Sequence, residues 1–283
     1  MTGFGPRSSR TVLRRATRPY RGDRNGERPL LYRTEGIVIR SIDYGEGNKI
    51  ITIMTPSLGK QGIVIRGARK PKSRYASLAQ LFTLGDFSFY KGGGLGSLNS
   101  GEIIDSFRGL REGLDQAAYA SYLVELCDRA IQDEDAGAFL YHQLHAGLTA
   151  ISEGKNPRIV ARLFEMKIAA AAGYAPMLDA CAGCGREDGT FYFSAAGGGA
   201  LCALCRHRDP RAMELEDGVW KLLRVFSAMD MRRLGNVAVK ESTAKQLATV
   251  MRTWFDHHLA LNLKSRHFLD QWERGEDFFK PVP

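Results

Sequence analysis

Two Cys-x-x-Cys pairs constrain this chain more than any other feature of its sequence. The pairs are Cys181/Cys184 and Cys202/Cys205, and 17 residues separate them. Each such turn directs two sulfurs toward one point, and two turns together complete a tetrahedron around zinc, with Zn–S distances of about 2.3 Å. Four thiolates leave no position open for water or substrate. We therefore expect one structural zinc ion per chain and no catalytic metal.

The residues around the pairs fit this interpretation. Gly183 and Gly185 ease the first turn. His207 is an alternative ligand by position, although we expect it to be a surface histidine. A thioredoxin-like redox function would need a single Cys-x-x-Cys at the start of a helix, rather than two facing pairs. The fifth cysteine, Cys127, lies on an apolar helical stripe and is predicted to belong to the core.

The first third of the chain is predicted to form short strands separated by turns. Isoleucines alternate with other residues in several segments, which is typical of half-buried strands. Five strands within about 75 residues fit an OB-type barrel, whose strand face and loops bind oligonucleotides, although an SH3-like barrel would give a similar pattern. The five predicted strands are 33–42, 49–55, 61–70, 84–91 and 96–107.

From residue 109 onward the apolar residues recur at helical spacing. Asn156 followed by Pro157 marks the start of one helix, which is expected to end near Gly173. The other helices are predicted around 113–131, 139–151, 219–229 and 247–259. The cysteine segment interrupts this pattern, so the fold class is α+β: a β-barrel, then an all-α domain with an inserted zinc segment. The predicted domains are a disordered basic arm (1–29), the OB-type domain (30–108), the zinc insertion (178–208), and a helical domain in two parts (109–177 and 209–283).

The positive charge is concentrated at the start of the chain. The net charge is +9, and residues 1–29 alone hold eight arginines against Asp23 and Glu27. Residues 30–107 add an excess of four positive charges, whereas residues 108–283 are almost neutral. This asymmetry favours a polyanionic partner for the N-terminal module, and an acidic protein or a membrane surface would respond to the same field. A solvated extension, or a start codon placed too early, would explain the arm equally well.

The most basic ordered segment is "KQGIVIRGARKPKSRYASL", residues 60–78, which contains no acidic residue. Lysines and arginines at one edge of a barrel would neutralise phosphates and release counterions. Tyr75 offers a surface for base stacking. A solvated basic loop is the simpler alternative. The DNA-binding candidates are Arg40, Lys49, Arg66, Arg69, Lys70, Lys72 and Arg74.

Signatures of catalysis and of membrane insertion are missing from the sequence. Two Gly-Lys pairs occur, Gly59-Lys60 followed by Gln61 and Gly154-Lys155 followed by Asn156, so there is no phosphate-binding G-x-x-x-x-G-K-[ST] motif. No clustered carboxylates suggest a two-metal nuclease. No apolar run approaches the roughly 20 residues that span a bilayer, and no secretory signal or membrane partner is expected. We expect a non-enzymatic protein.

Several segments together resemble a known family, the bacterial recombination mediator RecO. They are "GIVIRSIDYGEGNKIITIMTPSLGKQGIVIRGARKPKSRY", "FYKGGGLGSLNSGEIIDSF", "RLFEMKIAAAAGYAPMLDACAGCG" and "LCALC", in the order in which the family has them. The resemblance implies an OB barrel, a helical domain and a zinc segment. It also implies binding of ssDNA and dsDNA, annealing of complementary strands, and action with RecR to help load RecA onto ssDNA coated by single-strand-binding protein. Such a protein would work in the bacterial cytoplasm, at the nucleoid.

The resemblance extends to residue roles. It assigns DNA contact to the basic candidates named above and zinc ligation to the four paired cysteines. Family members bind the acidic C-terminal tail of single-strand-binding protein on the helical domain, and charge alone suggests Arg158, Arg162 and Lys167 for this contact. The alternative is a zinc-stabilised helical adaptor that acts mainly through protein partners, with only incidental DNA binding.

Overall fold

The computed structural model describes residues 29–130 and 137–273, which form two compact units. The first unit takes described residues 29–107 and 137–141, and the second takes 108–130 and 142–273. The predicted basic arm lies outside the described residues, apart from its last position, Pro29.

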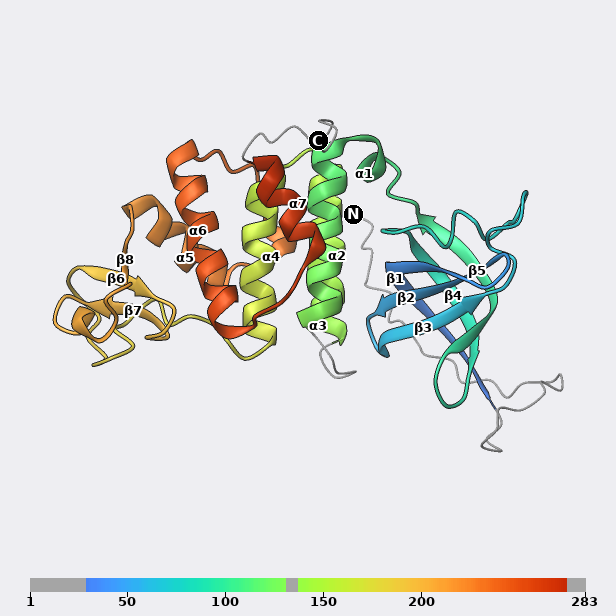
Figure 1. Cartoon of the computed structure of the whole chain (residues 1–283), viewed down its shortest axis with the longest axis horizontal. Helices are drawn as coiled ribbons and strands as arrows, with labels where there is room; N and C mark the ends of the chain where they lie inside the picture. Colours follow the sequence, from blue (N-terminus) through green and yellow to red (C-terminus); the bar gives the residue numbers. More distant parts are fainter. Residues whose placement is uncertain (1–28, 131–136, 274–283) are drawn as a thin grey trace, which may run out of the picture. The chain divides into compact units, whose positions relative to one another are not determined.

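The first unit contains five strands that close into a barrel in the order β1-β2-β3-β5-β4 (Figure 1). The strands are β1 (Leu30–Tyr44), β2 (Asn48–Thr55), β3 (Gly59–Ile65), β4 (Leu84–Lys91) and β5 (Gly96–Asp105). Antiparallel pairing of β1 with β4 closes the ring, and the short β3–β5 pairing is parallel. All five predicted strands are therefore present.

Alternation of apolar residues explains the barrel core. Ile51, Ile53, Ile63 and Ile65 are fully buried and pack with Phe87 and other residues of a single apolar cluster. The third strand was predicted to run to residue 70 but ends at Ile65. Its extension is prevented because Gly67 has a positive φ of 70°, which a strand cannot accommodate.

The start of the second long helix belongs to the barrel unit, although the sequence placed the whole helix in the helical domain. This helix is α3 (Gly137–Ser152). A Cβ added at Gly137 would lie 3.1 Å from the Cα of Gly59, the first residue of β3, so a larger residue would crowd this close approach. Tyr141 also lies 3.4 Å from Glu35 of β1 through its hydroxyl.

The second unit is built around helix α4 (Pro157–Ala171), which packs against α2, α5 and α6 (Figure 1). The Asn156 side chain accepts a hydrogen bond from the Arg158 N–H, and Pro157 occupies the first turn, as predicted. Every residue from Ile159 to Ala169 is buried, so α4 is covered on all sides. The remaining helices are α1 (Gly109–Glu112), α2 (Leu114–Ala130), α5 (Asp217–Ala228), α6 (Glu241–His258) and α7 (Lys264–Glu273).

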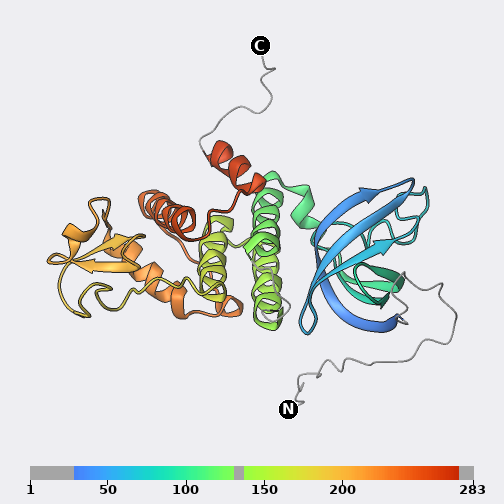
Figure 2. The same cartoon turned by 60° about the horizontal axis from the view of Figure 1, so that its bottom comes forward.

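The cysteine segment forms a small sheet at one end of the helical unit (Figure 2). Its strands are β6 (Phe191–Ser194), β7 (Gly199–Cys202) and β8 (Met213–Glu214), in the order β7-β6-β8. A short 3₁₀ helix, Arg206–Arg208, follows the second cysteine pair. Within the described ranges, none of the helices has the length and apolarity to cross a membrane.

Candidate metal centre and candidate nucleic-acid interface

The four paired cysteines meet at one point of the small sheet. Their sulfur atoms all lie within 4.8 Å of one another, and no other such ligand group occurs among the described residues. Cys184 Sγ and Cys202 Sγ are 3.7 Å apart, which is too far for a disulfide bond. The edge of a tetrahedral ZnS₄ site measures about 3.8 Å when each Zn–S bond is about 2.3 Å. The donor set and its spacing therefore fit zinc.

Backbone N–H groups favour the ionised form of Cys181, which is the form that binds a cation. The Cys202 N–H donates to Cys181 Sγ at 3.3 Å. Burial opposes ionisation of Cys181, but backbone N–H groups of Cys202, Gly183 and Cys184 outweigh it and lower the pKa of this thiol to about 6. Thiolates this close repel one another, and a divalent cation at their centre would remove that repulsion.

The two turns are shaped by glycine and by arginine. A Cβ at Gly183 would lie 3.1 Å from Cys205 Sγ, so any larger residue would disturb the cluster. Arg208 donates to the Gly183 carbonyl at 3.0 Å and so ties the second turn to the first. His207 is exposed, with its Nδ1 2.8 Å from the Leu204 carbonyl, and it is not part of the sulfur cluster. The structure therefore does not support His207 as a zinc ligand.

The sheet that carries the cysteines is fixed to the helices by Phe193. This side chain is fully buried, and its ring centroid lies 5.5 Å from Trp254 of α6 and 6.4 Å from Trp220 of α5. His258 of α6 reaches the Ala195 carbonyl at 3.0 Å. The small sheet therefore packs into the helical core through Phe193. A metal ion bound by the four sulfurs would stabilise this sheet, which is a structural role.

The basic loop that follows β3 is held against the turn between β1 and β2. Gly67 donates its N–H to the Asn48 side chain at 2.9 Å, and Arg69 donates its N–H to the Gly47 carbonyl at 3.0 Å. A Cβ at Gly47 would lie 3.5 Å from Cγ of Lys70, so the Lys70 side chain lies over this turn. The loop and the hairpin turn thus form one surface.

Three predicted DNA-binding residues meet on this surface. Lys49 Nζ lies 2.9 Å from Asp43 Oδ1, and Arg69 Nε lies 3.2 Å from Asp43 Oδ2. Lys70 lies beside them, over the turn. The hydrogen bond from Lys49 is the main cause of a lowered Asp43 pKa, so this carboxylate is ionised at neutral pH. No sequence signal had indicated that an acid lies among these cations.

Other predicted DNA-binding residues lie elsewhere on the barrel surface. Arg40 pairs with Thr52 in the β1–β2 ladder, three residues before Asp43, and an odd offset along a strand places its side chain on the opposite, outward face. Arg66, Lys72 and Arg74 are exposed along the loop. Lys72 has a positive φ of 62°. The structure therefore brings Lys49, Arg69 and Lys70 together and separates Arg40 from them.

The aromatic residue best placed for base stacking is one that the sequence did not single out. Tyr75 is half-buried against the barrel core, and the Arg74 guanidinium covers its ring at 4.6 Å. Tyr44 is 53% exposed and lies on the outward face of the hairpin with Arg40. Tyr44 was overlooked because it lies between the predicted strands 33–42 and 49–55, although strand alternation would have placed it in phase with Arg40.

The three candidates for partner binding lie on α4 and do not form one exposed patch. Arg162 is buried and pairs with Glu165 at 3.1 Å. Lys167 is buried and donates to the Ser227 carbonyl at 2.9 Å, and burial lowers its pKa. Arg158 is partly exposed and pairs with Glu241 of α6 at 3.1 Å. Only Arg158 offers its charge to the surface, beside a small cavity that Lys245 also lines.

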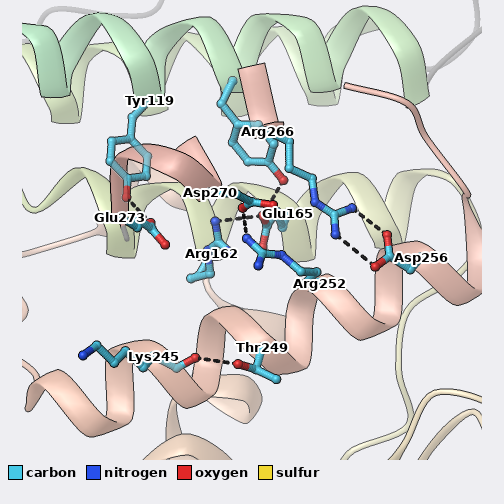
Figure 3. A network of polar contacts seen from close by, with 11 residues as sticks. Tyr119, Arg162, Glu165, Lys245, Thr249, Arg252, Asp256, Arg266, Asp270 and Glu273 are labelled. Carbon is cyan, nitrogen blue, oxygen red and sulfur yellow. Dashed lines mark hydrogen bonds and ion pairs between the residues drawn. The ribbon is translucent and has the colours of Figure 1, made fainter. Parts of the chain in front are cut away.

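Arg162 belongs to a polar network that joins four helices (Figure 3). Tyr122 of α2 donates to Glu165 at 2.5 Å, and Arg252 of α6 pairs with Asp270 of α7. Arg266 of α7 binds Asp256 through two bonds of 2.7 and 3.0 Å. These pairs bind α7 to the helical body, although Glu165 Oε2 and Arg252 Nε are buried without a hydrogen-bond partner among the described residues.

Comparison with known proteins gives consistent matches along the chain. Residues 30–107 match the family model described as "Recombination protein O N terminal", and residues 111–267 match "Recombination protein O C terminal". The "DNA repair protein RecO" of Halalkalibacterium halodurans is 42% identical over 244 residues, which cover 86% of this chain and 96% of that protein. The protein of the same name from Bacillus mycoides is 42% identical over 245 residues, covering 87% and 99%.

Proposed function

Because this chain belongs to the RecO family of DNA repair proteins, we propose that it is a non-enzymatic recombination mediator that binds ssDNA and dsDNA and anneals complementary strands. The observation that carries this proposal is the cationic surface where Lys49, Arg69 and Lys70 meet. DNA phosphates are bound by such cations, which neutralise their charge. Pairing of complementary bases requires no catalytic groups from the protein.

The barrel order β1-β2-β3-β5-β4 supports an OB-type fold for the first unit. In the proposed mechanism, Lys49, Arg69 and Lys70 neutralise phosphates, while Arg66, Lys72 and Arg74 extend the contact along the strand. Arg40 and Tyr44 contact DNA on the outward face of the hairpin, where Tyr44 stacks on bases. Binding through backbone and stacking tolerates any sequence, which leaves base edges available for pairing with a second strand.

One zinc ion per chain, held by Cys181, Cys184, Cys202 and Cys205, would supply a tetrahedral cross-link between the two turns of the small sheet. We assign it a structural role. No catalytic activity is proposed.

The partners follow from the family. We propose that the protein acts with RecR and helps RecA replace single-strand-binding protein on ssDNA, at the nucleoid in the bacterial cytoplasm. The acidic C-terminal tail of single-strand-binding protein would dock on the helical unit at Arg158 and Lys245, which line one small cavity with Arg162 beneath them. Lys167 is a weaker candidate because its ammonium group is buried and bonded to Ser227.

The test is the double variant Arg69→Ala/Lys70→Ala, assayed for annealing and for ssDNA affinity at several salt concentrations. Loss of two phosphate contacts should reduce the slope of log K against log salt by about 1.4, since each contact on ssDNA contributes about 0.7. A matched control is Arg108→Ala/Lys240→Ala, which removes two exposed cations of the helical unit. An unchanged slope in the Arg69/Lys70 variant would refute the assignment.

The alternative is an adaptor that works mainly through proteins, and the zinc-braced attachment of the small sheet to α5 and α6 favours it as the second candidate. A pull-down with single-strand-binding protein, with and without its acidic tail, separates the two functions. If the Arg69/Lys70 double variant anneals normally and retains all partner binding, the adaptor is the better description.

A further inference from the structure

A groove with a volume of about 640 Å³ lies beside the cysteine segment, within the helical unit. Residues of β6, β8 and α5 line it, together with residues just before β6. This volume is within the range of ligand-binding pockets. The function proposed above does not use the groove.

The groove exists because β8 separates from β6 soon after the two strands pair. The pairing covers Tyr192 and Phe193 of β6, and helix α5 begins at Asp217, soon after β8 ends at Glu214. The backbone before Tyr192 therefore has no strand neighbour on this side. An extended peptide can add to such an open edge through main-chain hydrogen bonds, while neighbouring pockets select its side chains. The shape of the groove therefore favours an extended chain segment.

The floor of the groove is apolar. Phe191, Leu215 and Trp220 form this floor, and each is at most 9% exposed. Val225 of α5 also lines the groove, and its side chain is an exposed apolar one, with 39% of its surface accessible. A ligand with apolar side chains would remove this surface from water.

The rim of the groove is acidic. It consists of three exposed carboxylates, those of Glu187, Glu214 and Asp217. None of these carboxylates makes a hydrogen bond or an ion pair with any described residue. The rim is therefore available to pair with cations that a ligand brings.

Two cations line the groove with these carboxylates, and they do not balance the charge of the rim. Arg224 is engaged elsewhere, because it donates to the Leu178 carbonyl at 3.1 Å and lies 3.7 Å from Asp179. Among the described residues of the groove, this leaves Lys221 as the one cation facing the rim. The groove therefore favours a cationic ligand and disfavours the phosphates of a nucleic acid.

Arginine is the cation best suited to this combination of surfaces. Guanidinium groups pair with carboxylates in bidentate fashion and stack on tryptophan rings. The groove already contains a contact of the second kind, since the Arg224 guanidinium lies 5.9 Å from the ring centroid of Trp220. A segment that alternates arginine with apolar residues would offer both kinds of side chain along one extended backbone.

We propose that the groove lined by Phe191, Trp220 and Glu214 docks an extended segment of a partner protein in which arginine alternates with apolar residues. The backbone of this segment adds to the open edge of β6, its arginines pair with the rim carboxylates, and its apolar side chains cover the floor. The proposal does not rest on the DNA-binding function, so either can fail without the other.

The experiment uses the full-length, zinc-loaded protein without DNA, and the fluorescein-labelled peptide Arg-Leu-Arg-Leu-Arg-Leu-Arg as the probe. Fluorescence anisotropy should show saturable binding of one peptide per chain. The triple variant E187Q/E214Q/D217N should weaken the affinity at least about threefold, the lower bound for losing three exposed charge pairs. Val225→Lys should also weaken it, because this substitution adds a cation to the groove and removes an exposed apolar side chain.

Matched control variants test whether these effects are local to the groove. The triple variant E46Q/E112Q/E153Q removes three exposed carboxylates that do not line the groove, and it should bind the peptide like the wild type. Leu114→Lys, at an exposed leucine of α2, should do the same. A peptide with serine in place of leucine should bind more weakly, because it cannot cover the floor. Circular dichroism and zinc content establish that all variants are folded.

Three results would overturn the proposal directly. The peptide does not bind saturably, the E187Q/E214Q/D217N variant binds it as tightly as the wild type, or the E46Q/E112Q/E153Q variant loses as much affinity. A fourth result is self-association of the wild type, seen by analytical ultracentrifugation, that E187Q/E214Q/D217N abolishes. A second copy of this chain would then occupy the groove in place of the proposed partner.

Discussion

Asp43 Oδ2 lies 3.2 Å from Arg69 Nε, and the other oxygen of the same carboxylate accepts a hydrogen bond from Lys49 at 2.9 Å. A single acid therefore neutralises two of the three cations that gather at the proposed DNA surface. A DNA phosphate must displace this carboxylate before it can pair with either side chain. The ion pairs hold the basic loop in place but also reduce its attraction for phosphate.

Substitution of Asp43 by Asn should strengthen DNA binding. Removal of the competing charge releases Lys49 and Arg69, and exposed pairs of this kind contribute about 0.2–1 kcal/mol each, so ssDNA affinity at low salt should rise roughly two- to thirtyfold. The salt dependence should become steeper, because more counterions are released. Fluorescence anisotropy at several salt concentrations measures both quantities.

The control for this prediction is Asp86→Asn, which breaks the exposed Asp86–Arg33 pair, 2.7 Å long, in the same barrel. This pair lies between β1 and β4, away from the basic loop. An Asp43→Asn variant that binds ssDNA no more tightly than Asp86→Asn would contradict the role given to Asp43.

Removal of zinc should unfold the small sheet and weaken the helical unit. The sulfur cluster joins the two cysteine turns, and Phe193 of the same sheet is part of the helical core. We expect one zinc per chain by elemental analysis, and a fall in melting temperature of roughly 10 °C or more after chelation. The variant Cys184→Ser should show the same loss.

Cys127→Ala is the matched control for the zinc prediction, because Cys127 is buried in α2 and lies outside the cluster. It should retain one zinc per chain even if its core packing is weakened. Unchanged helicity and melting temperature after confirmed metal removal would show that the cluster is not a structural site.

Much of this architecture could be predicted because periodicity and spacing record it directly. Alternating isoleucines indicated the barrel strands, Asn156-Pro157 marked the start of α4, and the cysteine spacing predicted the sulfur cluster that the structure brings together. These signals are local in the sequence, so they can be recognised without knowledge of the tertiary fold.

The features that sequence analysis missed depend on tertiary neighbours. Arg162 and Lys167 looked like surface cations, but α4 is covered on all sides, so both are buried and paired within the protein. Helix α7 spans only ten residues, and its helically spaced Phe268, Leu269 and Trp272 form too short a repeat to identify it from the sequence. The ion pairs of Asp43 likewise result from a loop folding back on a hairpin.

Phe193→Ala should weaken the attachment of the small sheet without removing its metal. The fully buried ring packs between Trp220 and Trp254, so its loss leaves a cavity that costs about 3–5 kcal/mol of unfolding free energy. Zinc content should stay at one per chain, because the side chain supplies no ligand.

Urea denaturation and elemental analysis measure the two effects of Phe193→Ala separately. Tyr192→Phe serves as the control, because the neighbouring ring is half-buried under Arg206 and keeps its shape. Loss of zinc from the Phe193→Ala protein in the absence of denaturant would mean that the ring is needed to form the site itself.

The stability of the helical unit should depend on acid through Asp230. This carboxylate accepts hydrogen bonds from Arg232, the shortest of them 2.6 Å, and from Gln143 of α3, whose own carbonyl accepts from the Met231 N–H. The Arg232 hydrogen bonds are the main cause of an Asp230 pKa well below its ordinary value of 3.8. A lowered carboxyl pKa stabilises the fold above pH 3.8, and that stabilisation is lost as the pH falls further.

Asp230→Asn should therefore be less stable than the wild type at pH 7, by about 1 kcal/mol, and the difference should shrink between pH 4 and pH 2 as Asp230 becomes protonated in the unfolded state of the wild type. Urea denaturation at pH 7, 4 and 2.5 measures this difference. Asp188→Asn, at an exposed carboxylate with no partner among the described residues, should match the wild type at each pH. If the gap between the wild type and Asp230→Asn stays constant down to pH 2.5, ionised Asp230 does not stabilise the fold.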